Sequence, residues 1–179
     1  MTPTEINTLA AEIHVLNRKW WPEDVTTRNK SQICILIVSE ITECMEGERK
    51  DLMDDKLPHR KMAEVEMADT AIRVLDVMGA FNYQYVEGTD MTDNWSSFDP
   101  DPACDTKEDR LFAIVGLIAM ADRYRRTSTW MSNILYLVSE YCRRYGYDLW
   151  GAVREKLEYN KTRYDHTDEG RAAAGGKKW

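Results

Sequence analysis

Apolar side chains recur every three or four residues along most of this 179-residue chain. On an α-helix that spacing places them on one face, which is the face that packs into a core. The pattern predicts helices over residues 2–19, 31–45, 61–81, 108–126, 129–145 and 148–163. No pair of alternating runs joined by a two-residue turn indicates a β-hairpin. We therefore expect an all-α bundle of about five to six helices.

Local signals mark where the elements begin and end. Thr2 has the features of an N-cap, with Pro3 at the first helical position and Glu5 placed to complete a capping box. Pro58 suits the first turn of the third helix. Residues 86–107 form an acidic, turn-rich stretch without periodicity, and we expect a long loop there. The pattern predicts one helical domain over residues 1–164, followed by a flexible tail over residues 165–179.

The composition of the chain limits the classes of partner that we expect it to bind. The formal net charge of −7 disfavours binding to the phosphate backbone of a polymeric nucleic acid, although it leaves room for a single nucleotide held through cations. No apolar run approaches the roughly 18 residues of a membrane helix, so we expect no membrane partner. The four cysteines form no metal-ligand or CxxC spacing, which favours a reducing, cytoplasmic setting; they are Cys34, Cys44, Cys104 and Cys142.

Two carboxylate pairs are the candidate chemistry. Glu40 and Glu43 lie in the sequence SEITE, and Glu66 and Asp69 in EMAD. A spacing of three puts each pair on one side of its helix. One interpretation is a solvated face with pairs such as Asp69 with Arg73. The other is a metal site, because Glu40 and Glu43 flank an apolar stripe, where facing carboxylates repel unless a cation neutralises them.

The expected cation is Mg²⁺, with Mn²⁺ as a substitute, because carboxylate oxygens and substrate phosphates are its usual ligands. A di-iron bundle would require Glu-x-x-His motifs. None of the three histidines has a glutamate three residues before it, so that alternative is weak.

The order of motifs resembles a known family, the MazG-like and dimeric dUTPase-like all-α nucleoside triphosphate pyrophosphohydrolases. The resemblance rests on E-x-x-E followed by E-x-x-D, on RKWWPEDVTTRNKSQICILIVSEITE, on KLEYNKTRY and on the terminal GGKKW. Residues 108–146 would be helices additional to the minimal family domain. The stretches MEGERKDLMDD and LPHRKMAEVEMAD resemble phage-encoded members, which implies the host cytoplasm.

The resemblance implies hydrolysis of a (d)NTP to the monophosphate and pyrophosphate. Glu40, Glu43, Glu66 and Asp69 would hold Mg²⁺, and Glu43, or else Glu40, would serve as general base. Guanine nucleotides are expected ahead of dUTP and dCTP, as in nucleotide-pool control. Family members assemble as homodimers or homotetramers. The alternative is a non-catalytic oligomeric binding or regulatory protein that kept the fold.

The substrate-binding candidates are Lys156, Asn160 and Arg163, and also Trp20 and Trp21. The first three are spaced four and three apart, so they would share a helix face and reach phosphates or sugar. The other interpretation is a basic last turn that interacts with the helix dipole. A tryptophan could stack on a base or pack in the core or an interface.

Overall fold

The computed structural model describes residues 1–18, 26, 29–86, 106–123, 128–163, 170 and 172. These residues form six helices and confirm the predicted all-α class: α1 Pro3–Asn17, α2 Lys30–Lys50, α3 Met62–Ala80, α4 Lys107–Arg123, α5 Ser128–Tyr145 and α6 Leu149–Asn160. Within the described ranges the only β-type pairing is an isolated bridge between Met53 and Lys61.

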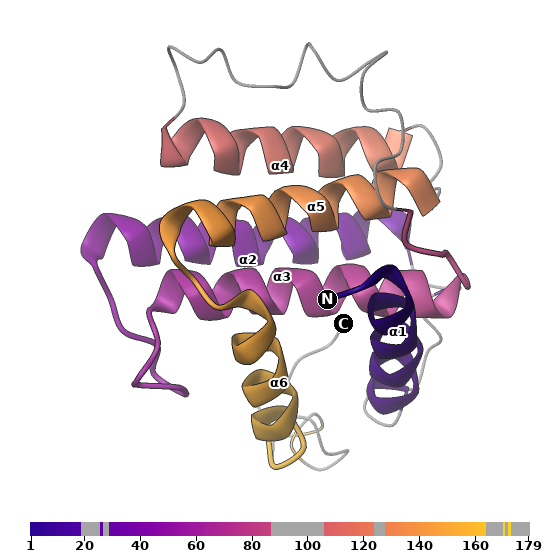
Figure 1. The fold of residues 1–179 in the computed structure, drawn as a ribbon, viewed down its shortest axis with the longest axis horizontal. Helices are drawn as coiled ribbons and strands as arrows, with labels where there is room; N and C mark the ends of the chain where they lie inside the picture. Colours follow the sequence, from indigo (N-terminus) through magenta and orange to yellow (C-terminus); the bar gives the residue numbers. More distant parts are fainter. Residues whose placement is uncertain are drawn as a thin grey trace.

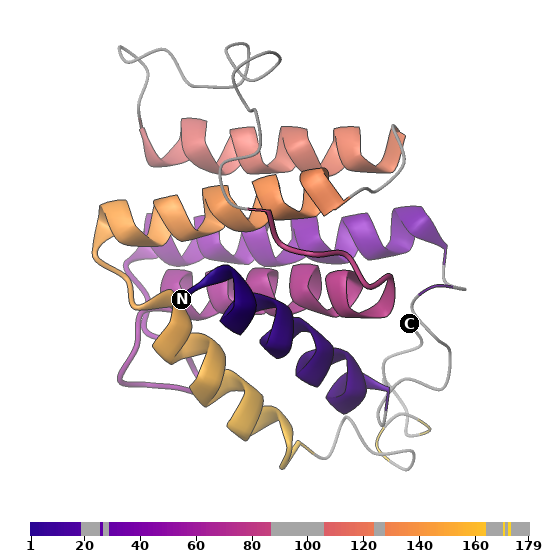
Figure 2. The same cartoon turned by 45° about the vertical axis from the view of Figure 1, so that its right-hand side comes forward.

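Helix α3 is the centre of the bundle and contacts α1, α2, α5 and α6. Figures 1 and 2 show α2 and α3 side by side, with α4 and α5 on one side of them; α5 packs against α3, and α4 packs against α2 and α5. Helices α1 and α6 cross the other side of the pair at a steep angle (Figure 1). Helix α3 is therefore covered on both sides, and α2 packs mainly against α3 and α4.

The predicted start of α1 is confirmed in detail. The Thr2 hydroxyl accepts a hydrogen bond from the Glu5 backbone N–H, and the Glu5 side chain accepts one from the Thr2 backbone. Asn29 caps α2 in a similar way by accepting from the Ser31 N–H. These side chains satisfy backbone donors that the first helical turn leaves without partners.

Several helix boundaries differ from the predicted ones. Helix α2 continues to Lys50 instead of ending at residue 45, because Gly47 stays buried against α3 and Glu46 pairs with Lys50 one turn later. A β-carbon at Gly47 would lie 2.9 Å from the backbone nitrogen of Ala63, so glycine allows the two helices to approach closely.

The third helix begins at Met62, so Pro58 lies in the preceding loop and not in the first turn. The last helix ends at Asn160. The predicted end at residue 163 is wrong, because Lys161 and Thr162 continue as a turn with three-residue hydrogen bonds.

The predicted apolar stripes form the core. The stripes of α2 and α3 consist of nine buried residues: Ile33, Ile37, Ile41, Cys44, Met67, Ala71, Val74, Leu75 and Met78. Helices α4 and α5 contribute to the same cluster of buried side chains, so the additional helices share the core of the others. Three cysteines, Cys34, Cys44 and Cys142, are buried and carry reduced thiols.

A glycine sets the contact between α1 and α3. A β-carbon at Gly79 would lie 2.3 Å from the Ala10 carbonyl oxygen, so the helices cross closely only without a side chain there. His14 Nδ1 on α1 lies 3.0 Å from Asp76 Oδ1 on α3, within hydrogen-bond distance, across the same contact. Sequence reasoning found no partner for this histidine.

Most of the acidic stretch and of the tail lies outside the described residues: 87–105 of the first, and 165–179 apart from Gly170 and Ala172. Cys104 belongs to the first of these segments. None of the described helices combines the length and the apolar character that crossing a membrane requires.

Candidate metal centre

Three carboxylates meet between α2 and α3. Glu40 and Glu43 come from α2, one turn apart, and Glu66 comes from α3. One oxygen from each side chain lies within 4.8 Å of the other two. Glu40 and Glu66 are buried, whereas Glu43 is exposed. The structure thus brings together three of the four predicted ligands, and Glu43 gives the group access to solvent.

The apolar stripe of α2 turns Glu40 inward. Ile37 precedes Glu40 by three residues and Cys44 follows it by four, so both lie on the same side of the helix, and both are fully buried. Glu43 lies farther round the helix and reaches the edge of the core. The sequence placed these carboxylates beside the stripe, and the structure agrees.

Arg73 neutralises Glu40. Its Nε donates to Glu40 Oε1 at 2.7 Å, across from α3 to α2. The side chain of Arg73 keeps 32% of its surface exposed, whereas that of Glu40 keeps 9%. The arginine therefore pairs with a carboxylate on the opposite helix and not, as one interpretation of the sequence held, with Asp69 on its own helix.

Among the described residues, Glu66 makes no ion pair with a basic side chain. Only 6% of the residue is exposed. Burial raises the pKa of Glu66 to about 9, assisted by the charges of Asp69 and Glu40 and by the hydrogen bond between Glu66 and Glu40. Two carboxyl groups in contact must share either a proton or a cation.

Glu43 is the exposed member of the group. Partial burial raises its pKa, and the charges of Glu40 and Asp69 raise it further, while Arg73 and Lys56 act in the opposite direction. A solvent-exposed carboxylate with a raised pKa is suited to accept a proton near neutral pH.

Asp69, the fourth predicted ligand, pairs with a lysine instead of joining the group. Lys156 Nζ lies 2.7 Å from an Asp69 oxygen, and only 3% of the lysine side chain is exposed. Burial raises the pKa of Asp69 although the nearby ammonium opposes it. Burial alone would lower the pKa of Lys156, but the charges of Asp69, Glu66 and Asp54 and a hydrogen bond to Asp69 raise it. Lys156 is therefore a charged, buried counterion.

The other substrate-binding candidates are not brought to the carboxylates in the same way. Asn160 is the last residue of α6, and Arg163 lies beyond it, with 3.5 Å between Arg163 Nη1 and Asn160 Oδ1. The expected shared helix face of Lys156, Asn160 and Arg163 is thus interrupted by the end of the helix. Trp20 and Trp21 lie outside the described residues.

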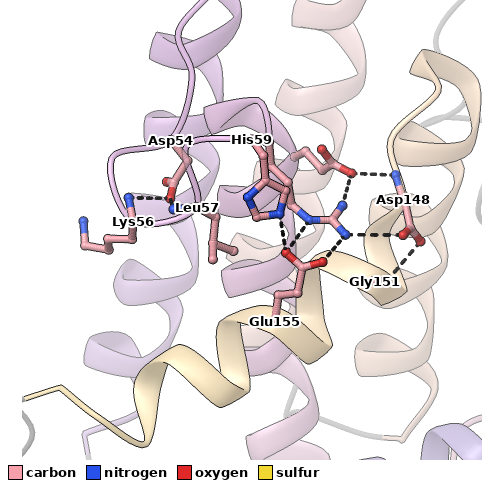
Figure 3. A network of polar contacts seen from close by, with 9 residues as sticks. Asp54, Lys56, Leu57, His59, Asp148, Gly151 and Glu155 are labelled. Carbon is pink, nitrogen blue, oxygen red and sulfur yellow. Dashed lines mark hydrogen bonds and ion pairs between the residues drawn. The ribbon is translucent and has the colours of Figure 1, made fainter.

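An arginine network holds α6 in the position that Lys156 requires, and sequence reasoning missed it (Figure 3). Arg60, in the loop before α3, donates to both oxygens of Glu155 at 3.0 and 2.8 Å and to Glu64 at 2.7 Å. Glu64 also accepts from the Asp148 backbone N–H at 2.8 Å. His59 lies 2.7 Å from Glu155 in the same network.

The network fixes α6 through the residue next to Lys156. Glu155 binds Arg60 in the loop before α3, and the adjacent Lys156 binds Asp69 on α3. The spacing of four between Arg60 and Glu64 was a visible local signal. No such local signal predicted the contacts of Arg60 with Glu155, which lies 95 residues farther along the chain.

A second polar cluster surrounds Glu48, near the end of α2. The hydroxyls of Tyr141 and Tyr147 both donate to Glu48 Oε1 at 2.8 Å, and Lys107 makes an ion pair with the other oxygen. Burial raises the pKa of Tyr141 and of Tyr147, and the Glu48 charge adds to it. The cluster joins α4 and α5 to the helix that carries Glu40.

Comparison of the chain with models of known protein families, with curated proteins and with solved structures found no match. The assignment of a function therefore rests on the residues of the chain and on their geometry.

Proposed function

We propose that the chain is a Mg²⁺-dependent nucleoside triphosphate pyrophosphohydrolase. The observation that supports this proposal most is the contact between Glu40 and Glu66, two buried carboxyl groups with Glu43 beside them. Such a group is stable only when a proton, a basic side chain or a bound cation offsets the repulsion between its carboxylates. The same residues carry the E-x-x-E and E-x-x-D resemblance in the sequence.

The donor set fits a hard divalent cation. All the candidate ligand atoms are carboxylate oxygens, the type that Mg²⁺ and Mn²⁺ prefer. Octahedral Mg²⁺ binds oxygens at about 2.1 Å, so its ligands lie roughly 3–4 Å apart. Oxygens within 4.8 Å of one another need only a small inward movement to reach that geometry.

The three carboxylates would have different roles, according to how deeply each is buried. Glu40 and Glu66 are buried and would hold the cation, while Glu43 is exposed and would accept a proton from the attacking water. A bound metal lowers the pKa of its water and neutralises phosphate oxygens. Attack of water on a phosphorus would break the bond between the α- and β-phosphates and release the monophosphate and pyrophosphate. Guanine nucleotides, ahead of dUTP and dCTP, stay a prediction.

The test is pyrophosphate release from purified protein. The eight common NTPs and dNTPs are incubated with Mg²⁺, and phosphate is measured after addition of inorganic pyrophosphatase. We expect release from at least one nucleotide, its loss in EDTA, and its loss in Glu43→Gln with an unchanged helical circular dichroism spectrum. Glu46→Gln is the matched control, because Glu46 lies on the same helix, is exposed and pairs with Lys50. A folded protein that releases no pyrophosphate from any nucleotide refutes the proposal.

A second candidate is a non-catalytic helical module. It is favoured by the two cations already at the site, because Arg73 and Lys156 neutralise Glu40 and Asp69 without any metal. This candidate predicts that Mg²⁺ leaves the melting temperature unchanged and that Glu43→Ala leaves the activity of the protein in the cell intact. The enzyme predicts loss of turnover with the fold retained.

A further inference from the structure

We propose that Arg73 is an exchangeable counterion: it neutralises Glu40 in the metal-free protein and moves to a phosphate oxygen of the substrate once a divalent cation occupies the carboxylates. This inference rests on the proposed function and adds a substrate-binding residue that the sequence did not indicate. It also gives the site an order of binding, with metal before polyphosphate.

The position of Arg73 makes the exchange possible. Arg73 lies on α3 one turn after Asp69 and two turns after Glu66, so all three share one side of the helix. Its guanidinium bonds to Glu40, which belongs to the metal group, and not to a carboxylate outside it. A cation bound by Glu40 would therefore compete directly with Arg73 for the same oxygens.

Burial separates Arg73 from the other cation of the site. The side chain of Arg73 keeps 32% of its surface exposed, against 3% for Lys156. Lys156 bonds to Asp69 and lies beside Glu155, which Arg60 holds. Moving this lysine would leave Asp69 without its counterion inside the protein, which would cost free energy. Lys156 stays as a fixed counterion, and Arg73 is the one that leaves.

The chemistry of the guanidinium suits the binding of a phosphate after its release from Glu40. A divalent cation on Glu40 removes the attraction that holds Arg73 and adds repulsion between like charges. A released guanidinium offers several donors in a planar fork, which matches phosphate oxygens in pairs, and it is less strongly hydrated than an ammonium. Glu43, the exposed carboxylate, marks the solvent side from which a polyphosphate would approach.

The exchange is tested by two binding measurements on Arg73→Gln. The first titrates Mn²⁺ alone and follows the free ion by electron paramagnetic resonance. We expect the variant to bind Mn²⁺ about tenfold more tightly than the wild type, because a competing cation is gone. The second titrates inorganic tripolyphosphate into protein saturated with Mg²⁺, by calorimetry. We expect about tenfold weaker binding, because a phosphate ligand is gone.

Two further variants separate this role from a structural one. Arg143→Gln removes an exposed arginine paired with Glu140, away from the site, and should match the wild type in both titrations. Arg73→Lys keeps the charge but loses the fork, so we expect Mn²⁺ binding like the wild type and weaker tripolyphosphate binding. This conservative variant decides the question if Arg73→Gln does not fold.

Each alternative result overturns a different statement. Absence of Mn²⁺ binding by the folded wild type overturns the proposed function itself. Mn²⁺ binding that is equal or weaker in Arg73→Gln overturns the competition and leaves the proposed function standing. Tripolyphosphate binding that is unchanged in the arginine variants overturns the transfer of Arg73 to phosphate.

Discussion

Raising the pH should destabilise the metal-free protein, because folding traps a proton on Glu66. The pKa of Glu66 is raised from its usual value of 4.5 to about 9, mainly by burial. Between these two values the folded state keeps a proton that the unfolded state loses, so stability is fully present at low pH and declines as the pH rises. The slope is about 1.4 kcal/mol per pH unit. From pH 6 to pH 8 we expect a loss of about 2–3 kcal/mol.

The assay is urea denaturation at pH 6, 7 and 8 in EDTA, followed by circular dichroism. Glu66→Gln is the comparison, because glutamine resembles the protonated acid and does not titrate. The wild type should lose about 2–3 kcal/mol more than this variant over the same range, which corresponds to roughly 5–10 °C in melting temperature for a chain of this size. Saturating Mg²⁺ should abolish the difference in slope, since a cation takes the place of the proton.

Parallel pH profiles of the wild type and Glu66→Gln in EDTA would refute this reasoning, because the buried carboxyl would then be ionised in the folded protein. A pH slope of the wild type that Mg²⁺ leaves unaltered would show that the cation binds elsewhere.

Three further changes test the framework around the site. Arg60→Met should cost about 3 kcal/mol in urea denaturation, because it strands the buried Glu64, whereas the exposed Arg143→Met should cost less than about 0.5 kcal/mol. Gly79→Ala should cost about 1–3 kcal/mol, since its β-carbon would meet the Ala10 carbonyl; an unchanged denaturation midpoint would contradict that contact. Tyr141→Phe removes one hydrogen bond to Glu48 and should cost about 1 kcal/mol in the same assay.

Much of the fold could be predicted because its determinants are local. The periodicity of Ile33, Ile37 and Ile41 predicts a buried face, and Thr2 with Glu5 predicts a helix start. The end of α2 at residue 50 could not be predicted in this way. It depends on the close packing of Gly47 against α3; a glycine in this charged stretch indicates that a close approach is possible, but not which element approaches.

The site was predictable only within each helix. A spacing of three places Glu40 and Glu43 together, and the meeting with Glu66 follows once two consecutive helices pack side by side. The cations were not predictable, because Arg73 reaches across to Glu40 and Lys156 reaches Asp69 from 87 positions farther along the chain. Choices among several basic residues depend on tertiary packing, which no short-range pattern encodes.

The buried cysteines make the packing of α5 against the site helices measurable. Cys44 on α2 and Cys142 on α5 are almost fully buried, and burial raises the pKa of the Cys44 thiol to about 12 and also raises that of Cys142. Because only a thiolate reacts quickly with disulfide reagents, these two thiols do not react while the helices remain packed together. The rate at which Ellman's reagent labels Cys44 and Cys142 in native buffer would therefore measure how often the bundle opens.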